Sequence, residues 1–241
     1  MLICGVLGLL AATPVLATST LLRNELKPVL AALADPPDAA APTRPELAAG
    51  TVSGLHLDAE WIRTTAAATD IPERALAAYA AATLTIQHEF PNCKLGWNML
   101  AAIGEVETRH GTIYGATLGD DGVAVPAITG PALDGGGAFK SIPDTDNGAL
   151  DGDTTWDRAV GPMQFIPQTW ERYGRDGNGD DIADPQNIDD AALSAAALLC
   201  TAGGDLSQNR NWTRAIYAYN HSAQYHRDVA DAANHYASFH P

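Results

Sequence analysis

"GWNMLAAIGEVETRHG", residues 96–111, carries two glutamates, Glu105 and Glu107, within an apolar run. Apolar residues at positions 97, 99, 100, 103 and 106 recur at helical spacing, which predicts a helix that Gly111 ends. Successive residues of a helix turn by about 100°, so the two carboxyl groups point to nearly opposite sides. They are therefore not expected to act as a pair.

The surroundings of the two glutamates differ. Glu105 is followed four residues later by Arg109, the order and spacing of an exposed ion pair, so we expect Glu105 to be solvated. Glu107 has glycines at positions 104 and 111, which are expected to leave open space beside its carboxyl. Apolar residues at 103 and 106 would raise its proton affinity, as a general acid requires near neutral pH. The alternative for Glu107 is a solvated side chain near a helix end.

The composition favours a globular chain that does not bind nucleic acid. Of the 241 residues, 46% are hydrophobic, which is enough for a sizeable core. The 29 Asp and Glu residues exceed the 14 Lys and Arg residues, giving a formal net charge of −15. Such a chain has no excess of cations to neutralise phosphates, which argues against a nucleic-acid partner.

The N-terminal region is predicted to direct export. Residues 1–17 form an apolar run whose end, Val15-Leu16-Ala17, resembles a signal-peptidase site. No positive charge precedes the run, so a retained membrane anchor and a buried helix are the alternatives to a cleaved signal peptide. Residues 18–60 are rich in Ala and Pro and are predicted to be a linker. Residues 61–241 are predicted to form the folded domain.

That domain is predicted to be mainly α-helical. One helix is expected within "DIPERALAAYAAATLTIQHEF", residues 70–90, with Asp70 as its N-cap and Pro72 in its first turn. Residues 112–160 are heavy in Gly, Pro and Asp, which predicts a long irregular insert. Further helical patterns cover residues 162–173, 187–202, 212–219 and 223–238.

Two cysteines are predicted to be bridged. Export would place the chain in an oxidising compartment, where Cys93 and Cys200 form an even pair. A disulfide between them would close a loop of 107 residues (200 minus 93), worth about 4–5 kcal/mol in the chain-entropy model. The alternative is two buried free thiols.

Three motifs in order carry a family resemblance. "IGEVETRHG" (103–111), "AVGPMQFIPQTW" (159–170) and "IYAYNHSAQYH" (216–226) together resemble the membrane-bound lytic murein transglycosylases of the B type. These are lysozyme-like enzymes that cut the glycan strands of peptidoglycan. The resemblance covers about residues 61–240, and it implies a lysozyme-like transglycosylase domain that carries the long insert.

The resemblance also implies the site residues. Glu107 matches the catalytic glutamate of the family's Val-Glu-Thr element, while Met163 and Gln164 match a segment that lines the substrate cleft. Tyr219 and Asn220 match a Tyr-Asn element on the opposite wall, and Tyr225 is a weaker match. The alternatives are plain core packing for the methionine and a helix whose tyrosine rings only pack.

The implied reaction is non-hydrolytic cleavage of the β-1,4 bond between N-acetylmuramic acid and N-acetylglucosamine. Glu107 would donate a proton to the glycosidic oxygen and then take one from the muramoyl C6 hydroxyl, leaving a 1,6-anhydromuramoyl end. The partner is the peptidoglycan glycan strand, and no cofactor is required for the chemistry. A hydrolytic muramidase of the same fold and a non-catalytic cell-wall-binding module are the alternatives.

An acidic stretch has the spacing of a calcium loop. In "DGNGDDIADPQNIDDA", residues 176–191, Asp176, Asn178 and Asp180 occupy positions 1, 3 and 5 of an EF-hand-like loop. Ile182 would offer its carbonyl at position 7, and the resemblance implies Asp190 as the closing carboxylate.

The stretch departs from the EF-hand pattern at two positions. Asp181 stands where the pattern has Gly, and Asn187 stands where it has Glu. Asp184 is a second candidate for the closing carboxylate. The sequence therefore predicts a structural calcium ion, and an Asx-rich turn without metal is the alternative.

Overall fold

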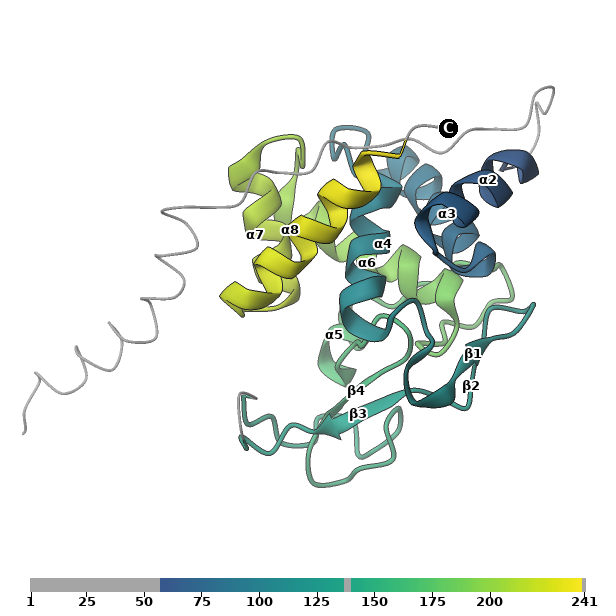
Figure 1. Cartoon of the computed structure of the whole chain (residues 1–241). Coiled ribbons are helices and arrows are strands. Elements are labelled where there is room, and N and C mark those ends of the chain that lie inside the picture. The colour runs from purple at the N-terminus through teal and green to yellow at the C-terminus, as the bar shows by residue number, and fades with distance from the viewer. Residues whose placement is uncertain (1–56, 137–139, 240–241) are drawn as a thin grey trace, which may run out of the picture.

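The computed structural model describes residues 57–136 and 140–239, and this part of the chain is mostly helical (Figure 1). The predicted mainly α fold class is thus confirmed. Its α-helices are α2 (Ala59–Thr69), α3 (Glu73–Glu89), α4 (Trp97–Thr108), α5 (Pro167–Tyr173), α6 (Ile188–Gly203), α7 (Asn209–Tyr219) and α8 (Ala223–Ala237). The predicted signal peptide or anchor at 1–17 and most of the predicted linker at 18–60 lie outside the described residues.

Helices α4 and α6 run through the middle of the helical part (Figure 1). Most residues of α6 are buried, because its Ala- and Leu-rich run is apolar and four other helices pack around it. The buried face of α4 includes Leu100 and Ile103, both with no exposed surface. Helix α8 packs along α4, so residues near the C-terminus reach the helix that carries both glutamates.

The insert forms two short antiparallel ribbons at one side of the helices (Figure 1). Strand β1 (Thr117–Leu118) pairs with β2 (Ala124–Val125), and β3 (Thr129–Ala132) pairs with β4 (Arg158–Val160). Aspartate side chains accept backbone N–H groups in its turns, as at Asp153 and Asp144. The prediction of a long irregular insert did not include these pairings.

Several predicted helix boundaries are wrong. Asp70 is the C-cap of α2, with φ of 57°, and Pro72 caps α3 without a side-chain hydrogen bond. Helix α4 ends at Thr108, before Gly111, because Arg109 adopts the left-handed conformation with φ of 50°. Residues 162–166 are not helical, because Phe165 pairs with the last residue of β4, and α5 begins at Pro167.

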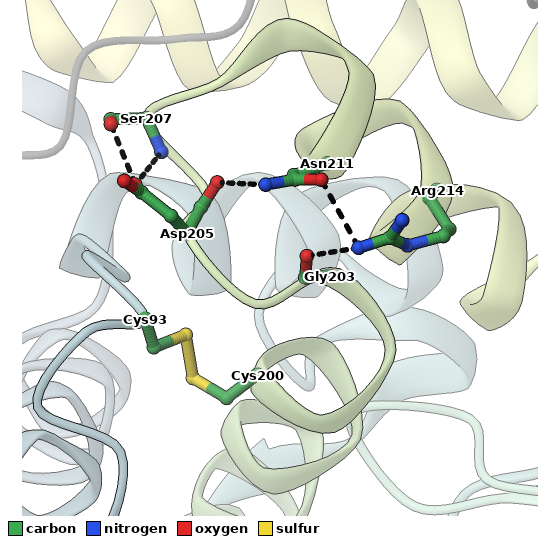
Figure 2. The surroundings of a disulfide bond; sticks show 7 residues. All are labelled: Cys93, Cys200, Gly203, Asp205, Ser207, Asn211 and Arg214. Atoms are coloured by element: carbon green, nitrogen blue, oxygen red, sulfur yellow. Dashed lines mark hydrogen bonds between the residues drawn. A yellow bond between two sulfur atoms is a disulfide. The ribbon is translucent and has the colours of Figure 1, made fainter.

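The predicted disulfide is confirmed. Cys93 precedes α4 and Cys200 lies near the end of α6, and their Cα atoms are 5.3 Å apart (Figure 2). The Cys93 carbonyl also accepts a hydrogen bond from Leu206 N at 2.7 Å. On the far side of the turn after α6, Arg214 donates to the Gly203 carbonyl at 2.5 Å (Figure 2). The bridge thus fastens the chain before α4 to the end of the most buried helix.

Within residues 57–136 and 140–239, none of the helices has the length and apolar character needed to cross a bilayer.

Candidate active site

Glu107 lies in the last turn of α4 and contacts the first turn of α8. Tyr225 of α8 donates its hydroxyl to Glu107 Oε1 at 2.6 Å. Burial raises the pKa of Glu107 to about 7, and the Tyr225 hydrogen bond opposes that rise by favouring the charged form. Residue 107 keeps part of its surface exposed. A large fraction of the Glu107 side chains therefore carries a proton at neutral pH.

Glu105 is exposed and contacts the opposite end of α8. Tyr236, in the last turn of that helix, donates to Glu105 Oε2 at 2.6 Å. The two carboxyls thus bond to different tyrosines, as their opposed directions on α4 require. The described residues form four ion pairs, and the predicted pair of Glu105 with Arg109 is not one of them. Arg109 lies beyond the end of the helix, so it does not have the helical position that the prediction assumed.

The glycines beside Glu107 do not open space, contrary to the prediction. A Cβ on Gly104 would lie 1.9 Å from the hydroxyl oxygen of Tyr79, and one on Gly111 would lie 2.9 Å from Leu118. Both glycines therefore admit close neighbours, and the access to Glu107 depends on other elements.

The segment Gly161–Gln164 is tied to the end of α4. Thr108, next to Glu107, donates its hydroxyl to the Pro162 carbonyl at 2.5 Å, and Tyr219 of α7 donates to the Met163 carbonyl at 2.7 Å. The side chain of Met163 has no exposed surface and belongs to the core. In this structure the segment meets the site through its backbone, and a contact of Met163 with substrate stays a prediction.

Gln164 turns its side chain back onto its own segment. Its φ is 51°, a conformation that residues other than glycine rarely adopt, and its Nε2 donates to the Gly161 carbonyl at 3.0 Å. Gly161 has no room for a side chain, since a Cβ there would lie 1.7 Å from the Pro185 carbonyl. The amide is thus held in one orientation within its own segment, and its contact with substrate stays a prediction.

The tyrosines of α7 and α8 form the other wall of the site. The rings of Tyr219 and Tyr225 are stacked, with centroids 6.4 Å apart and an interplanar angle of 6°. Asn220 accepts a hydrogen bond from Ser222 N at 2.9 Å and so shapes the turn between the helices. The residue that touches the acid is therefore Tyr225. Its signal in the sequence is the Ser222 N-cap, which places Tyr225 in the first turn of α8.

A second polar network lies on the Glu105 side of α4. Tyr79 and Tyr236 flank the buried His110, with their hydroxyls 3.2 Å from Nδ1 and 3.1 Å from Nε2. Burial lowers the pKa of His110 to about 4, so this imidazole is neutral near pH 7. A cavity of about 850 Å³ adjoins this network and is lined by Glu105 and Arg109 among others, but not by Glu107.

The acidic loop closes on itself. Asp190, at the start of α6, accepts hydrogen bonds from Gly177 N at 2.7 Å and Asp184 N at 2.9 Å, so the two ends of the loop meet. The Asp176 carboxylate faces inward and accepts from Gly179 N at 2.6 Å. Ile182 is 63% exposed. The atoms that the loop could offer to a metal ion are carboxylate, amide and carbonyl oxygens, the ligands that calcium prefers.

Comparison with known proteins finds a family that matches part of the chain. Residues 138–214 match the family described as "Transglycosylase SLT domain". This range holds Met163, Gln164 and the acidic loop, whereas Glu107 and Tyr225 lie outside it. A search of the curated proteins found no match.

One solved structure is similar over most of the chain. It is SltB3 from Pseudomonas aeruginosa in complex with NAG-anhNAM-pentapeptide, with 16% identity and a TM-score of 0.42 over 90% of this chain and 79% of that one. The family match confirms, at the level of the transglycosylase SLT domain, the resemblance that the sequence motifs predicted.

Proposed function

We propose that this protein is a peptidoglycan lytic transglycosylase of the B type, which cleaves the β-1,4 bond between N-acetylmuramic acid and N-acetylglucosamine. The observation that carries the proposal is the Glu107 carboxyl, with its pKa raised to about 7 and with Tyr225 bonded to it. It lies beside a segment of the matched transglycosylase domain. A pKa near the working pH suits a group that must give up a proton and later accept one.

The reaction uses one carboxyl twice. Protonated Glu107 donates to the glycosidic oxygen while the bond from that oxygen to the muramoyl C1 breaks, and positive charge develops on the sugar ring. The resulting carboxylate takes the proton of the C6 hydroxyl, whose oxygen bonds to C1. The products are a free 4-hydroxyl on N-acetylglucosamine and a 1,6-anhydromuramoyl end. Glu107 finishes protonated, as it began.

Tyr225 orients the acid. Its hydroxyl occupies Oε1 of Glu107, so we assign the proton transfers to Oε2. The same hydrogen bond stabilises the carboxylate that forms after bond cleavage, because a hydroxyl donor favours the charged form. The stacked ring of Tyr219, fixed through the Met163 carbonyl, holds Tyr225 in place.

Product analysis separates this function from its alternatives. Digestion of purified peptidoglycan, followed by mass spectrometry, is expected to give muropeptides that are one water lighter than hydrolytic products. Reducing muramic acid ends would indicate a hydrolytic muramidase of the same fold. Binding without any turnover would indicate a cell-wall-binding module.

Tyr225→Phe is expected to shift the pH profile. Losing the hydroxyl removes the interaction that lowers the pKa of Glu107, so this pKa rises further. Cleavage needs the protonated acid, so the basic limb of the pH–rate profile should move to higher pH. The maximal rate should fall roughly 3- to 10-fold, because the acid is no longer oriented by the hydroxyl. The check is a rate profile from pH 5 to 9. Tyr217→Phe is the control, since Tyr217 also lies on α7 but its ring packs on His221 and not on the Glu107 region. A basic limb that stays in place for Tyr225→Phe would refute the role.

The site of action follows from the substrate. Peptidoglycan lies outside the cytoplasm, so the proposed function goes with export, which residues 1–17 would direct. Membrane attachment through that segment remains part of the proposal.

A structural calcium ion in the loop 176–190 is also proposed. Asp176, Asn178, Asp180, the Ile182 carbonyl and Asp190 would hold it. Pro185 of this loop packs on Gly161, so a calcium-stiffened loop would support the segment beside Glu107. Chelation should lower the melting temperature, and added calcium should restore it by mass action. If elemental analysis finds no calcium in the folded protein and the melting curve does not change, the loop is an Asx-rich turn that binds no metal.

A further inference from the structure

Three aspartates of the insert gather around one point, outside the loop 176–190. Asp144, Asp146 and Asp157 each place a carboxylate oxygen within 4.8 Å of an oxygen from the other two. Two oxygens bound to one calcium ion at about 2.3–2.6 Å lie at most about 5 Å apart, so one ion can reach all three. We propose that these three aspartates bind a divalent cation, calcium, that holds the insert together.

One oxygen of this cluster is buried without a partner. Asp146 Oδ2 accepts a hydrogen bond from Leu150 N at 2.8 Å, but Oδ1 is enclosed and has no hydrogen-bond partner among the described residues. Buried polar atoms are nearly always paired, and an unpaired carboxylate oxygen is especially costly. A cation bound to Oδ1 would remove this cost.

No basic side chain neutralises the cluster. The four ion pairs of the described residues leave out all three aspartates. Arg158, the residue after Asp157, pairs with Asp153 and donates to the Gly130 carbonyl. Three carboxylates this close repel one another, and Asp157 has no exposed surface through which water could screen it. The charge of a divalent cation is what the cluster lacks.

The carboxylates are held in position before any ion arrives. Asp157 accepts from Thr145 through both oxygens, each at 2.8 Å, and one oxygen of Asp144 accepts from Gly148 N at 3.2 Å. Calcium accepts irregular arrangements of carboxylates, whereas magnesium demands a near-ideal octahedron and keeps its waters. The mixed set of one buried and two partly exposed carboxylates therefore favours calcium.

The ion would connect the insert to the Glu107 region. Asp157 N donates to the Ile142 carbonyl at 3.0 Å, and the Asp157 carbonyl accepts from Leu133 N at 3.0 Å, so residue 157 joins two segments of the insert. The chain then continues through β4 to Gly161 and the segment that Thr108 holds. Binding at residue 157 would therefore stabilise the insert where it leads into this segment.

The test measures calcium binding and melting temperature in the full-length chain after chelation and desalting. All variants carry Asp176→Asn, which weakens the other acidic loop. In this background calcium should still bind and raise the melting temperature by about 5–10 °C at a free concentration of about 100 times Kd. Adding Asp146→Asn, which keeps the size of the side chain, should remove both the binding heat and the shift.

Asp134→Asn in the same background is the matched control. Asp134 is an exposed aspartate of the same insert that also accepts a backbone N–H, from Gly136, and it lies outside the cluster. It should keep the calcium response, which excludes an effect of net charge alone. A background protein that calcium does not stabilise, or equal responses from Asp146→Asn and Asp134→Asn, would overturn the proposal. Because neither readout depends on glycan cleavage, failure here is distinct from failure of the proposed function.

Discussion

Replacing Glu107 with glutamine is expected to lower the release of anhydromuramoyl products by at least about 10³-fold. The amide keeps the shape of the side chain and can still accept the Tyr225 hydrogen bond, but it supplies no proton to the glycosidic oxygen. One group serves as acid and then as base, so both steps fail together, and each alone is worth about 10²–10⁴-fold. The measurement is chromatography of digests of purified peptidoglycan.

The same substitution should stabilise the fold at neutral and higher pH. The pKa of Glu107 is raised to about 7 in the folded state, above its usual value of 4.5. The free energy of unfolding therefore falls as the pH rises above 4.5, because the carboxyl ionises more readily in the unfolded chain. The glutamine carries no such cost, and its free energy of unfolding above pH 7 should exceed the wild-type value by about 1–3 kcal/mol. At pH 4, where both states are protonated, the difference should disappear.

Glu105→Gln is the control for this experiment. Its side chain lies on the same helix, exposed, and bonds to Tyr236 instead of Tyr225. The glutamine oxygen can still accept that bond, so we expect full activity and a loss of at most about 1 kcal/mol. If Glu105→Gln were inactive while Glu107→Gln still cleaved, the assignment of the acid would be wrong.

Removal of the Cys93–Cys200 bridge has the second large expected effect. The bridge closes a loop of 107 residues, and opening it restores chain entropy worth about 4–5 kcal/mol to the unfolded state. For a domain of this size the loss corresponds to a fall in melting temperature of roughly 10–15 °C. Thermal melting of the Cys93→Ala, Cys200→Ala variant against wild type measures it.

Cys4→Ser, which removes the remaining cysteine, should melt as the wild type does. Non-reducing peptide mapping should also recover Cys93 and Cys200 in one linked fragment. Equal melting temperatures for the double alanine variant and the wild type would show that the bridge contributes nothing.

The helical part of the fold was largely predictable because apolar periodicity reports burial directly. The boundaries were less so. Asp70 reads as an N-cap, yet its left-handed conformation ends the preceding helix, and an oxygen-bearing residue suits either place. Arg109 likewise ends α4 before Gly111 does. Tertiary contacts determine which residue ends a helix, and these contacts cannot be derived from the local sequence.

The candidate site was predicted in part. The opposed directions of Glu105 and Glu107 follow from helix geometry, and the structure gives each its own tyrosine. The burial of Met163 could not be predicted from the sequence, because a methionine is equally compatible with a core position and with a position that lines a cleft. Tyr225 reaches Glu107 across 118 residues of chain through the packing of α8 on α4, a contact that no local spacing encodes.

The chain of hydrogen bonds through His110 has a fixed polarity. Tyr236 donates to Glu105, so its oxygen can only accept from His110, which must then carry its proton on Nε2. The neutral imidazole leaves Nδ1 as an acceptor for the Tyr79 hydroxyl. All three protons therefore point along the chain of hydrogen bonds toward Glu105. Glu105 takes no part in the proposed chemistry, yet it selects the tautomer of the buried His110, which is connected to it through two hydrogen bonds.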